Sequence, residues 1–269
     1  MRYLSIVFLV LVCSQIKAQE LFVVTEPASN VPAGSIGIRV AQSLMNKEIE
    51  SGSLYNLSPE VTWGVNKNLM VRASAFLNNS SNELEGKGAG VYAKYRFFSV
   101  DDLQSHFRMA AFGRYSWNNS RMLSEGIDLA AGNSGYEAGI VATQLIKKVA
   151  LSSSFSYSQS TDNLENYSNP DLESKNALNY TFSVGKLMYP KRYTSFKQTN
   201  INTMLEFVGQ TLPSSGKSYL DVVPSVQFII NSQARIDIAY KKELYSSMLR
   251  AAHDGFYLKL EYTFFNVTK

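Results

Sequence analysis

Hydrophobic and polar residues alternate along most of this chain, and the stretch 255–265 near its end shows the pattern most plainly. If this stretch is an extended strand, one side carries the charged residues Lys259 and Glu261. The other side carries Phe256, Leu258, Leu260, Tyr262 and Phe264. A soluble protein would bury the apolar side in a core. An outer-membrane barrel would turn it toward lipid and point the charged side into a lumen.

The same period of two predicts about twelve strands. They span residues 35–44, 55–65, 69–77, 88–98, 107–117, 135–145, 149–158, 177–187, 198–209, 218–230, 234–242 and 255–265. Most have roughly the 9–11 residues that a tilted membrane strand needs. Within 234–242, the alternation assigns Ile238 to the lipid side and its neighbour Ala239 to the lumen.

Short and long connections also alternate. Residues 66–68, 146–148 and 231–233 form tight turns, whereas 45–54, 78–87, 118–134, 159–176 and 243–254 are long and polar. If both termini are periplasmic, the short turns are periplasmic and the long loops extracellular. The sequence therefore predicts an all-β fold, a transmembrane antiparallel up-and-down β-barrel.

Barrel width decides which face points outward. A barrel of twelve strands is wider than an eight-stranded barrel, whose interior side chains can just fill, so an inward apolar face would leave a void. Aromatic residues at the ends of the outward rows resemble two interfacial girdles; they are Trp63, Tyr95, Phe97, Phe107 and Phe264 at one end and Trp117, Tyr136, Tyr157 and Phe256 at the other. A two-sheet sandwich, which would bury the same aromatics, is the alternative fold.

Two prolines interrupt predicted strands. Pro59 and Pro224 lack the backbone N–H that a closed barrel would use at every position, since a barrel has no edge. The sequence predicts local bulges at both.

The amino terminus has the features of an export signal. Arg2 precedes an apolar run, residues 6–12, that is too short to span a bilayer, and a cleavage site follows at Ala18. The chain therefore divides into a signal peptide (1–18), a periplasmic N-terminal segment (19–34) and an outer-membrane barrel (35–269). Cys13, the one cysteine, leaves with the signal, although it could instead be the modified cysteine of a lipoprotein. A mature chain without cysteine points to a Gram-negative envelope.

Overall charge gives little information on partners. The formal charge of +4 falls to about +2 when Arg2 and Lys17 are removed, because two cations leave. That balance is too small to indicate nucleic acid binding. The expected partners are outer-membrane lipid, the barrel-assembly machinery and a small solute whose identity the sequence does not give.

Two stretches near the start resemble a known family. Residues 26–35, EPASNVPAGS, precede the first strand, and residues 57–70, LSPEVTWGVNKNLM, form a strand, a turn and a strand. Together they resemble outer-membrane proteins similar to the phenol meta-pathway transporter-like family. This resemblance implies a barrel linked to uptake of hydrophobic or aromatic compounds. It covers about the first quarter of the chain and carries no binding residues across.

Candidate catalytic and metal residues are few. A barrel hydrolase or acyltransferase needs a histidine beside a serine and a carboxylate, and the chain has only His106 and His253. His253 precedes Asp254 and follows Ser246 and Ser247, but adjacent residues rarely orient one another in this way. No catalytic site, metal site or cofactor is expected. The acidic residues of one long loop could hold calcium, but a solvated loop is the favoured interpretation; they are Asp162, Glu165, Asp171 and Glu173.

Charged residues on the predicted lumen side are the strongest functional signal. The third to fifth strands supply only basic residues there, namely Arg72, Lys94, Arg96, Arg108 and Arg114. Later strands mix both signs, with Glu137, Glu206, Asp221, Arg235, Asp237, Lys241, Lys259 and Glu261. These residues either form ion-pair ladders that fill the barrel or line a pore with a modest preference for anions.

Three functions are consistent with these features. The first is an outer-membrane channel or transporter for small solutes, located in the bacterial outer membrane. The second is a non-conducting structural or surface-binding barrel, closed by side chains or by residues 19–34. The third is a lipid-modifying barrel enzyme that depends on His253.

Overall fold

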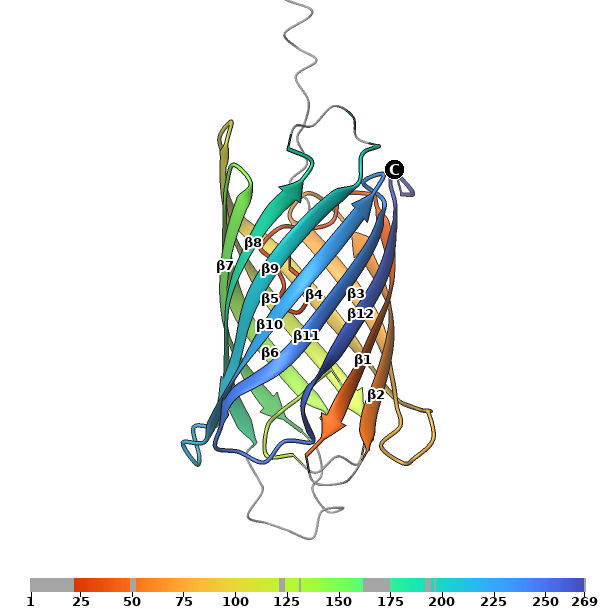
Figure 1. Cartoon of the computed structure of the whole chain (residues 1–269), viewed down its shortest axis with the longest axis vertical. Helices are drawn as coiled ribbons and strands as arrows, with labels where there is room; N and C mark the ends of the chain where they lie inside the picture. Colours follow the sequence, from red (N-terminus) through yellow and green to blue (C-terminus); the bar gives the residue numbers. More distant parts are fainter. Residues whose placement is uncertain are drawn as a thin grey trace, which may run out of the picture.

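Twelve antiparallel strands close on themselves to form one barrel (Figure 1). The computed structural model describes residues 22–48, 52–120, 124–130, 132–161, 175–191, 195 and 197–268. The strands are β1 (Ile36–Lys47), β2 (Ser53–Gly64), β3 (Leu69–Asn78), β4 (Glu85–Asp101), β5 (Ser105–Asn118), β6 (Gly135–Ile146), β7 (Val149–Ser160), β8 (Asn176–Tyr189), β9 (Asn200–Thr211), β10 (Ser218–Ile230), β11 (Ala234–Ser246) and β12 (Ala252–Phe264). No helix able to span a membrane occurs among these residues.

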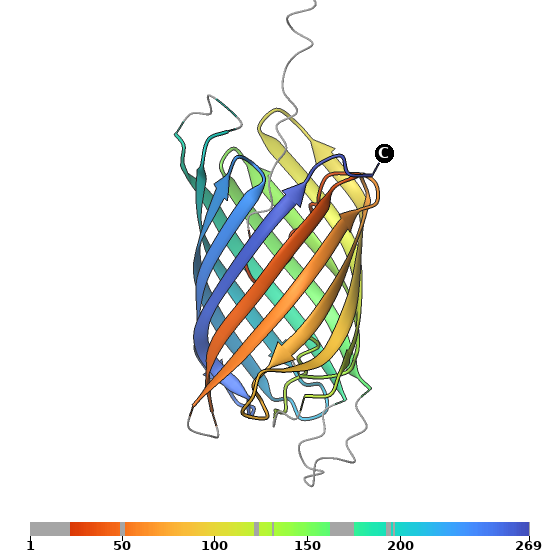
Figure 2. The ribbon, with the colours of Figure 1, turned by 90° about the vertical axis from the view of Figure 1, so that its right-hand side faces the viewer.

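Each strand pairs with its neighbours in the sequence, and β1 pairs with β12 to close the barrel (Figure 2). The closing ladder runs from Ile36 opposite Phe264 to Lys47 opposite Ala252. All twelve strands lie within a few residues of their predicted bounds. The closed topology confirms the up-and-down barrel and excludes the two-sheet sandwich.

The two ends of the barrel differ in their connections. The turns at 65–68, 147–148 and 231–233 lie at the end that carries the C-terminus, here called the terminal end (Figure 1). Asn231 and Ser232 have φ values of 53° and 57°, the left-handed backbone that tight hairpins require. Longer connections, including 119–134 and 247–251, lie at the opposite end, here called the long-loop end. Most of the connection after β7, including the four acidic residues considered for calcium, lies outside the described residues.

Apolar residues cover the outside of the wall, as the barrel width predicts. On β12, Phe256 keeps 59% of its surface exposed and Leu260 keeps 42%, whereas the Glu261 side chain between outward neighbours keeps 8%. The predicted girdle residues Trp63, Tyr95, Trp117 and Tyr136 are also exposed. So much exposed apolar surface is unfavourable in water and fits a hydrocarbon environment.

The prolines do not produce the predicted bulges. Pro59 pairs in register with Val40 of β1, and Pro224 pairs in register with Leu205 of β9. On the opposite side of each proline, the ladder omits two positions and then resumes without a shift at that point. The expectation of bulges at these prolines was wrong because a missing N–H affects only one of the two ladders that each strand forms.

Candidate functional site

Residues 22–34, here called the lumen segment, run inside the barrel toward β1 (Figures 1 and 2). Phe22 and Val23 are each 3% exposed and pack against the inward face of the wall. Their buried neighbours are Ala150, Met204, Val223 and Ala239, from β7, β9, β10 and β11. Ala28 packs farther along with Ala110 and Val141. The sequence predicts a periplasmic segment over 19–34, and the described part of that range lies within the barrel.

Glu206 of β9 binds the start of this segment. Its Oε1 accepts hydrogen bonds from the backbone N–H of Val23 at 2.9 Å and of Val24 at 3.2 Å. Its Oε2 accepts from the N–H of Val24 at 3.1 Å and of Thr25 at 2.7 Å. The Thr25 hydroxyl lies 2.9 Å from Ser183 Oγ. A segment that joins no sheet has no neighbouring strand to accept hydrogen bonds from its backbone N–H groups. Here one buried carboxylate accepts hydrogen bonds from three of them.

Basic side chains of the wall bind the carbonyls of the lumen segment. Lys94 Nζ donates to the carbonyl oxygens of Pro27 and Ser29, both at 2.7 Å. Lys259 Nζ donates to the Val23 oxygen at 2.6 Å. Arg108 Nη1 donates to Ser29 Oγ at 3.0 Å. These three predicted lumen residues, together with Glu206, therefore hold the segment from opposite sides.

Glu26 brings the carboxylate of the lumen segment into a cluster of cations. Its Oε1 lies 2.5 Å from Arg72 Nη1 and 3.9 Å from Arg39 Nη1, and its Oε2 lies 3.7 Å from Lys94 Nζ. Burial alone would raise the pKa of Glu26, but the positive charges of Arg72, Lys94 and Arg39 outweigh it and hold that pKa well below its ordinary value. The cluster fixes the segment to β1, β3 and β4.

Arg39 and Glu60 extend this network and were missed in the sequence. Arg39 Nε lies 2.6 Å from Glu261 Oε2, and Arg39 Nη1 lies 3.3 Å from Glu60 Oε2. Arg235 Nη2 contacts the same Glu261 oxygen at 2.8 Å. The alternation could have identified Arg39, since it stands between the outward Ile38 and Val40. Glu26 had no such signal, because the lumen segment has no strand periodicity.

The remaining predicted residues do not meet at one point. Arg96 Nη2 donates to the Lys67 carbonyl at the terminal end. Arg114 lies 3.8 Å from Glu137, which accepts from Ser156 Oγ at 2.5 Å. The Arg114 side chain keeps 28% of its surface exposed. Asp237 lies 3.2 Å from Arg235. Asp221 and Lys241 face the long-loop end, 3.8 Å apart. Of the five basic residues predicted on β3 to β5, three bind the lumen segment, namely Arg72, Lys94 and Arg108, and two do not.

Two connections also fold inward at the long-loop end. Gln210 of β9 accepts from the Ile127 N–H and donates to the Ile127 oxygen, both at 2.9 Å. Ile127 and Leu129 pack with Leu212 and Met248 in a buried cluster. The Leu249 N–H donates to Glu125 Oε2 at 2.7 Å. Residues 124–130 and 247–251 therefore cover part of the mouth at this end.

The histidines show no arrangement for nucleophilic catalysis. His106 Nδ1 lies 2.8 Å from Asp101 in the β4–β5 hairpin. Ser246 donates to the Met248 carbonyl and Ser247 to the Ser218 carbonyl, so both hydroxyls bind backbone oxygens. Within the described ranges, no group of three or more His, Cys, Asp or Glu side chains could hold a metal ion.

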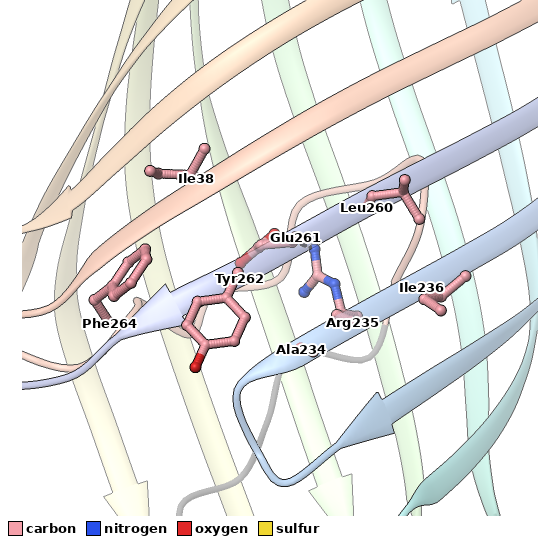
Figure 3. Close-up of a pocket in the computed structure, with 8 residues that line it drawn as sticks. All are labelled: Ile38, Ala234, Arg235, Ile236, Leu260, Glu261, Tyr262 and Phe264. Atoms are coloured by element: carbon pink, nitrogen blue, oxygen red, sulfur yellow. Dashed lines mark hydrogen bonds and ion pairs between the residues drawn. The ribbon is translucent and has the colours of Figure 1, made fainter.

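A hollow of about 360 Å³ lies on the outer wall, where β1, β11 and β12 meet (Figure 3). Figure 3 shows Ile38, Ile236 and Leu260 around it, with Tyr262 and Phe264 nearer the terminal end. These are outward apolar residues around the small side chain of Ala234. The hollow opens on the outer surface, and the charged residues Arg235 and Glu261 also contribute to its lining.

Comparison with known proteins supports the fold. No family model matches the chain, and no curated protein matches its sequence. The KdgM porin has a TM-score of 0.50 at 10% identity, over 85% of this chain and 99% of its own. The NanC porin has 0.51 at 9% identity, over 85% and 98%. An outer membrane channel from Pseudomonas putida F1 has 0.56 at 11% identity, over 90% and 99%.

These identities are low, so the likeness concerns the fold alone. The chain has the barrel architecture of porins and outer membrane channels. The resemblance to the phenol meta-pathway transporter-like family stays a prediction.

Proposed function

We propose that this chain is an outer-membrane channel for small polar solutes, and that the lumen segment sets its conductance. The observation that carries the proposal is the contrast between the two faces of the wall. The outer face is apolar and exposed, and the inner face carries charged residues along the length of the barrel, including Arg72, Arg114 and Asp221. A polar interior favours hydrated solutes over the hydrophobic or aromatic compounds that the N-terminal resemblance implies.

The proposed location and orientation of the barrel in the membrane follow from its two faces and its two ends. The outer face would meet outer-membrane lipid after insertion by the barrel-assembly machinery. The terminal end would be periplasmic and the long-loop end extracellular. The lumen segment would then close the channel from the periplasmic side. Residues 23–29 of the segment bond to side chains of the wall, so the barrel can remain closed as a sheet when this part of the segment moves.

Substitution Glu206→Gln tests this function. The change removes the negative charge that three backbone N–H groups share, and hydrogen bonds to charged groups contribute about 1.5–3 kcal/mol. Since about 1.4 kcal/mol is a factor of ten in population, the open state should rise about tenfold or more. Planar-bilayer recording should therefore show rare or small openings in the wild type and frequent, larger openings in Glu206→Gln.

Glu137→Gln is the matched control, because Glu137 is an inward carboxylate that contacts Ser156 and Arg114 rather than the lumen segment. It should leave the conductance near the wild-type value. Heat-modifiable gel migration would establish that each variant folds. Equal conductance in the wild type and both variants would overturn the role of the segment.

A non-conducting barrel is the second candidate, favoured by the packing at the long-loop end. There, Ile127 and Met248 are buried together over the mouth, opposite the lumen segment at the other end. This candidate predicts no current in the wild type and none in folded Glu206→Gln. The same recordings therefore separate the two functions.

A further inference from the structure

The Arg250 side chain, from the connection 247–251, is enclosed by side chains of the wall, and the space that it occupies among them is here called the recess. The side chain keeps only 8% of its surface exposed. Its Nη1 donates to Asp221 Oδ1 at 2.7 Å and its Nη2 to Asp221 Oδ2 at 2.5 Å, a two-pronged contact between guanidinium and carboxylate. Its Nη1 also donates to Glu243 Oε2 at 3.1 Å. Its Cζ lies 3.9 Å from the centre of the Tyr219 ring.

The groups that surround this guanidinium belong to the barrel wall. Tyr219 and Asp221 lie on β10 and Glu243 lies on β11, whereas Arg250 lies on a connection. Asp221 and Glu243 stand directly opposite each other in the β10–β11 ladder. Like charges in that position repel, so the wall itself requires a cation there. The aromatic face of Tyr219 adds a surface that attracts cations.

Charge balance shows what the recess lacks without Arg250. Two carboxylates, Asp221 and Glu243, face two cations, Arg250 and Lys241, whose Nζ lies 3.8 Å from Asp221 Oδ2. Removing the guanidinium leaves one negative charge uncompensated next to the Tyr219 ring. A planar cation with N–H groups on two edges would restore both the balance and the two-pronged contact.

We propose that Tyr219, Asp221 and Glu243 form a binding site for guanidinium-bearing solutes, and that Arg250 occupies it as an internal ligand. A solute enters when the connection 247–251 lifts, and its guanidinium takes the place of the Arg250 side chain. The connection is also held by the Arg250 N–H, which donates to Glu48 Oε2 at 3.0 Å, and by the packing of Met248. A free solute therefore competes with the Arg250 side chain, which is covalently tethered next to the site. The site binds weakly in the wild type for that reason.

Binding at this site does not require the barrel to conduct, so it can be measured on protein in detergent. Full-length Arg250→Ala protein is heated with methylguanidinium chloride, methylammonium chloride or sodium chloride at equal ionic strength. The unfolding midpoint is read by circular dichroism. Methylguanidinium should raise the midpoint of Arg250→Ala by about 3 °C when present at about ten times its Kd, more than either other salt does, and should affect the wild type little.

The double variant Arg250→Ala/Asp221→Asn is the control, because it removes the carboxylate that makes the two-pronged contact. It should lose the selective effect of methylguanidinium. If Arg250→Ala does not fold, Arg250→Gln, which fills more of the recess without charge, should show the same preference.

Equal shifts with all three salts, or an undiminished methylguanidinium effect in the double variant, would overturn the site. Equal stabilisation by methylammonium would overturn the preference for guanidinium, because the site would then select charge alone. Absence of ionic current through the wild-type protein in bilayers would count against the channel function but not against this binding site.

Discussion

Single inward and outward positions of this barrel have opposite consequences for the same substitution. Ile238 and Ala239 are neighbours on β11, and they are 48% and 3% exposed, respectively. Ile238 faces outward, whereas Ala239 packs against Phe22 and Val23 of the lumen segment. The sequence alone assigned the two faces correctly but not the occupant of the lumen, because the alternation describes the wall only.

Arginine at these two positions should separate barrel assembly from closure. Ile238→Arg places a charge on the lipid-facing surface and should cost about 2–4 kcal/mol or prevent assembly. Ala239→Arg should leave the wall folded but displace Phe22 and Val23, because the packed site has no space for the longer side chain. The folded fraction of Ile238→Arg in lipid vesicles, measured by heat-modifiable migration, checks the expected loss of assembly. Bilayer conductance of Ala239→Arg checks the expected displacement of the lumen segment. If Ala239→Arg prevents folding more strongly than Ile238→Arg, the assignment of faces is wrong.

At the scale of elements, strands were predictable and the segments inside the barrel were not. Apolar and polar residues alternate along strands such as β11 because one side meets apolar surroundings and the other does not. This period of two can be recognised in the sequence. The lumen segment and residues 124–130 instead make contacts specific to this fold, such as the bonds of Val23 to Glu206 and of Ile127 to Gln210. Those contacts join residues 183 and 83 positions apart, and nothing local indicates them.

Acid should release the lumen segment through Glu26. The pKa of this carboxyl is depressed in the folded state, so its ion pairs contribute fully above its unfolded pKa, about 4.3. Their contribution is lost as the pH falls from there through the lower folded value. Loss of the Glu26 ion pairs should thus increase wild-type conductance as the pH falls below about 4.

Glu26→Gln provides the comparison for this pH dependence. It removes the titrating group and the pairing with Arg72 and Lys94 at every pH, so its conductance should be raised already at neutral pH. Its further increase on acidification should be smaller than that of the wild type. An identical acid response in both proteins would assign the effect to other carboxyls, such as Glu206.

On the scale of the whole molecule, the proposed conductance of the barrel depends on the lumen segment that lies inside its wall. Of the five predicted basic residues of β3 to β5, Arg72, Lys94 and Arg108 bind the lumen segment. Arg96 instead binds the Lys67 carbonyl, and Arg114 keeps 28% of its side-chain surface exposed with a long ion pair of 3.8 Å to Glu137. The modest anion preference expected from the sequence stays a prediction. If it exists in the open state, it should weaken as salt shortens the screening length from about 10 Å at 0.1 M to about 3 Å at 1 M.

Movement of the lumen segment should open a conducting barrel, and a reversible cross-link can hold the segment in place while current is measured. The hydroxyl oxygens of Thr25 and Ser183 lie 2.9 Å apart, so cysteines at both positions are close enough to form a disulfide. The predicted mature chain contains no other cysteine. Thr25→Cys/Ser183→Cys is combined with Glu206→Gln, and single-channel current is recorded before and after addition of a reductant. We expect a closed barrel when oxidised and frequent openings when reduced, with no response in either single-cysteine variant. Equal current in the oxidised and reduced states, with the disulfide verified, would contradict gating by the lumen segment.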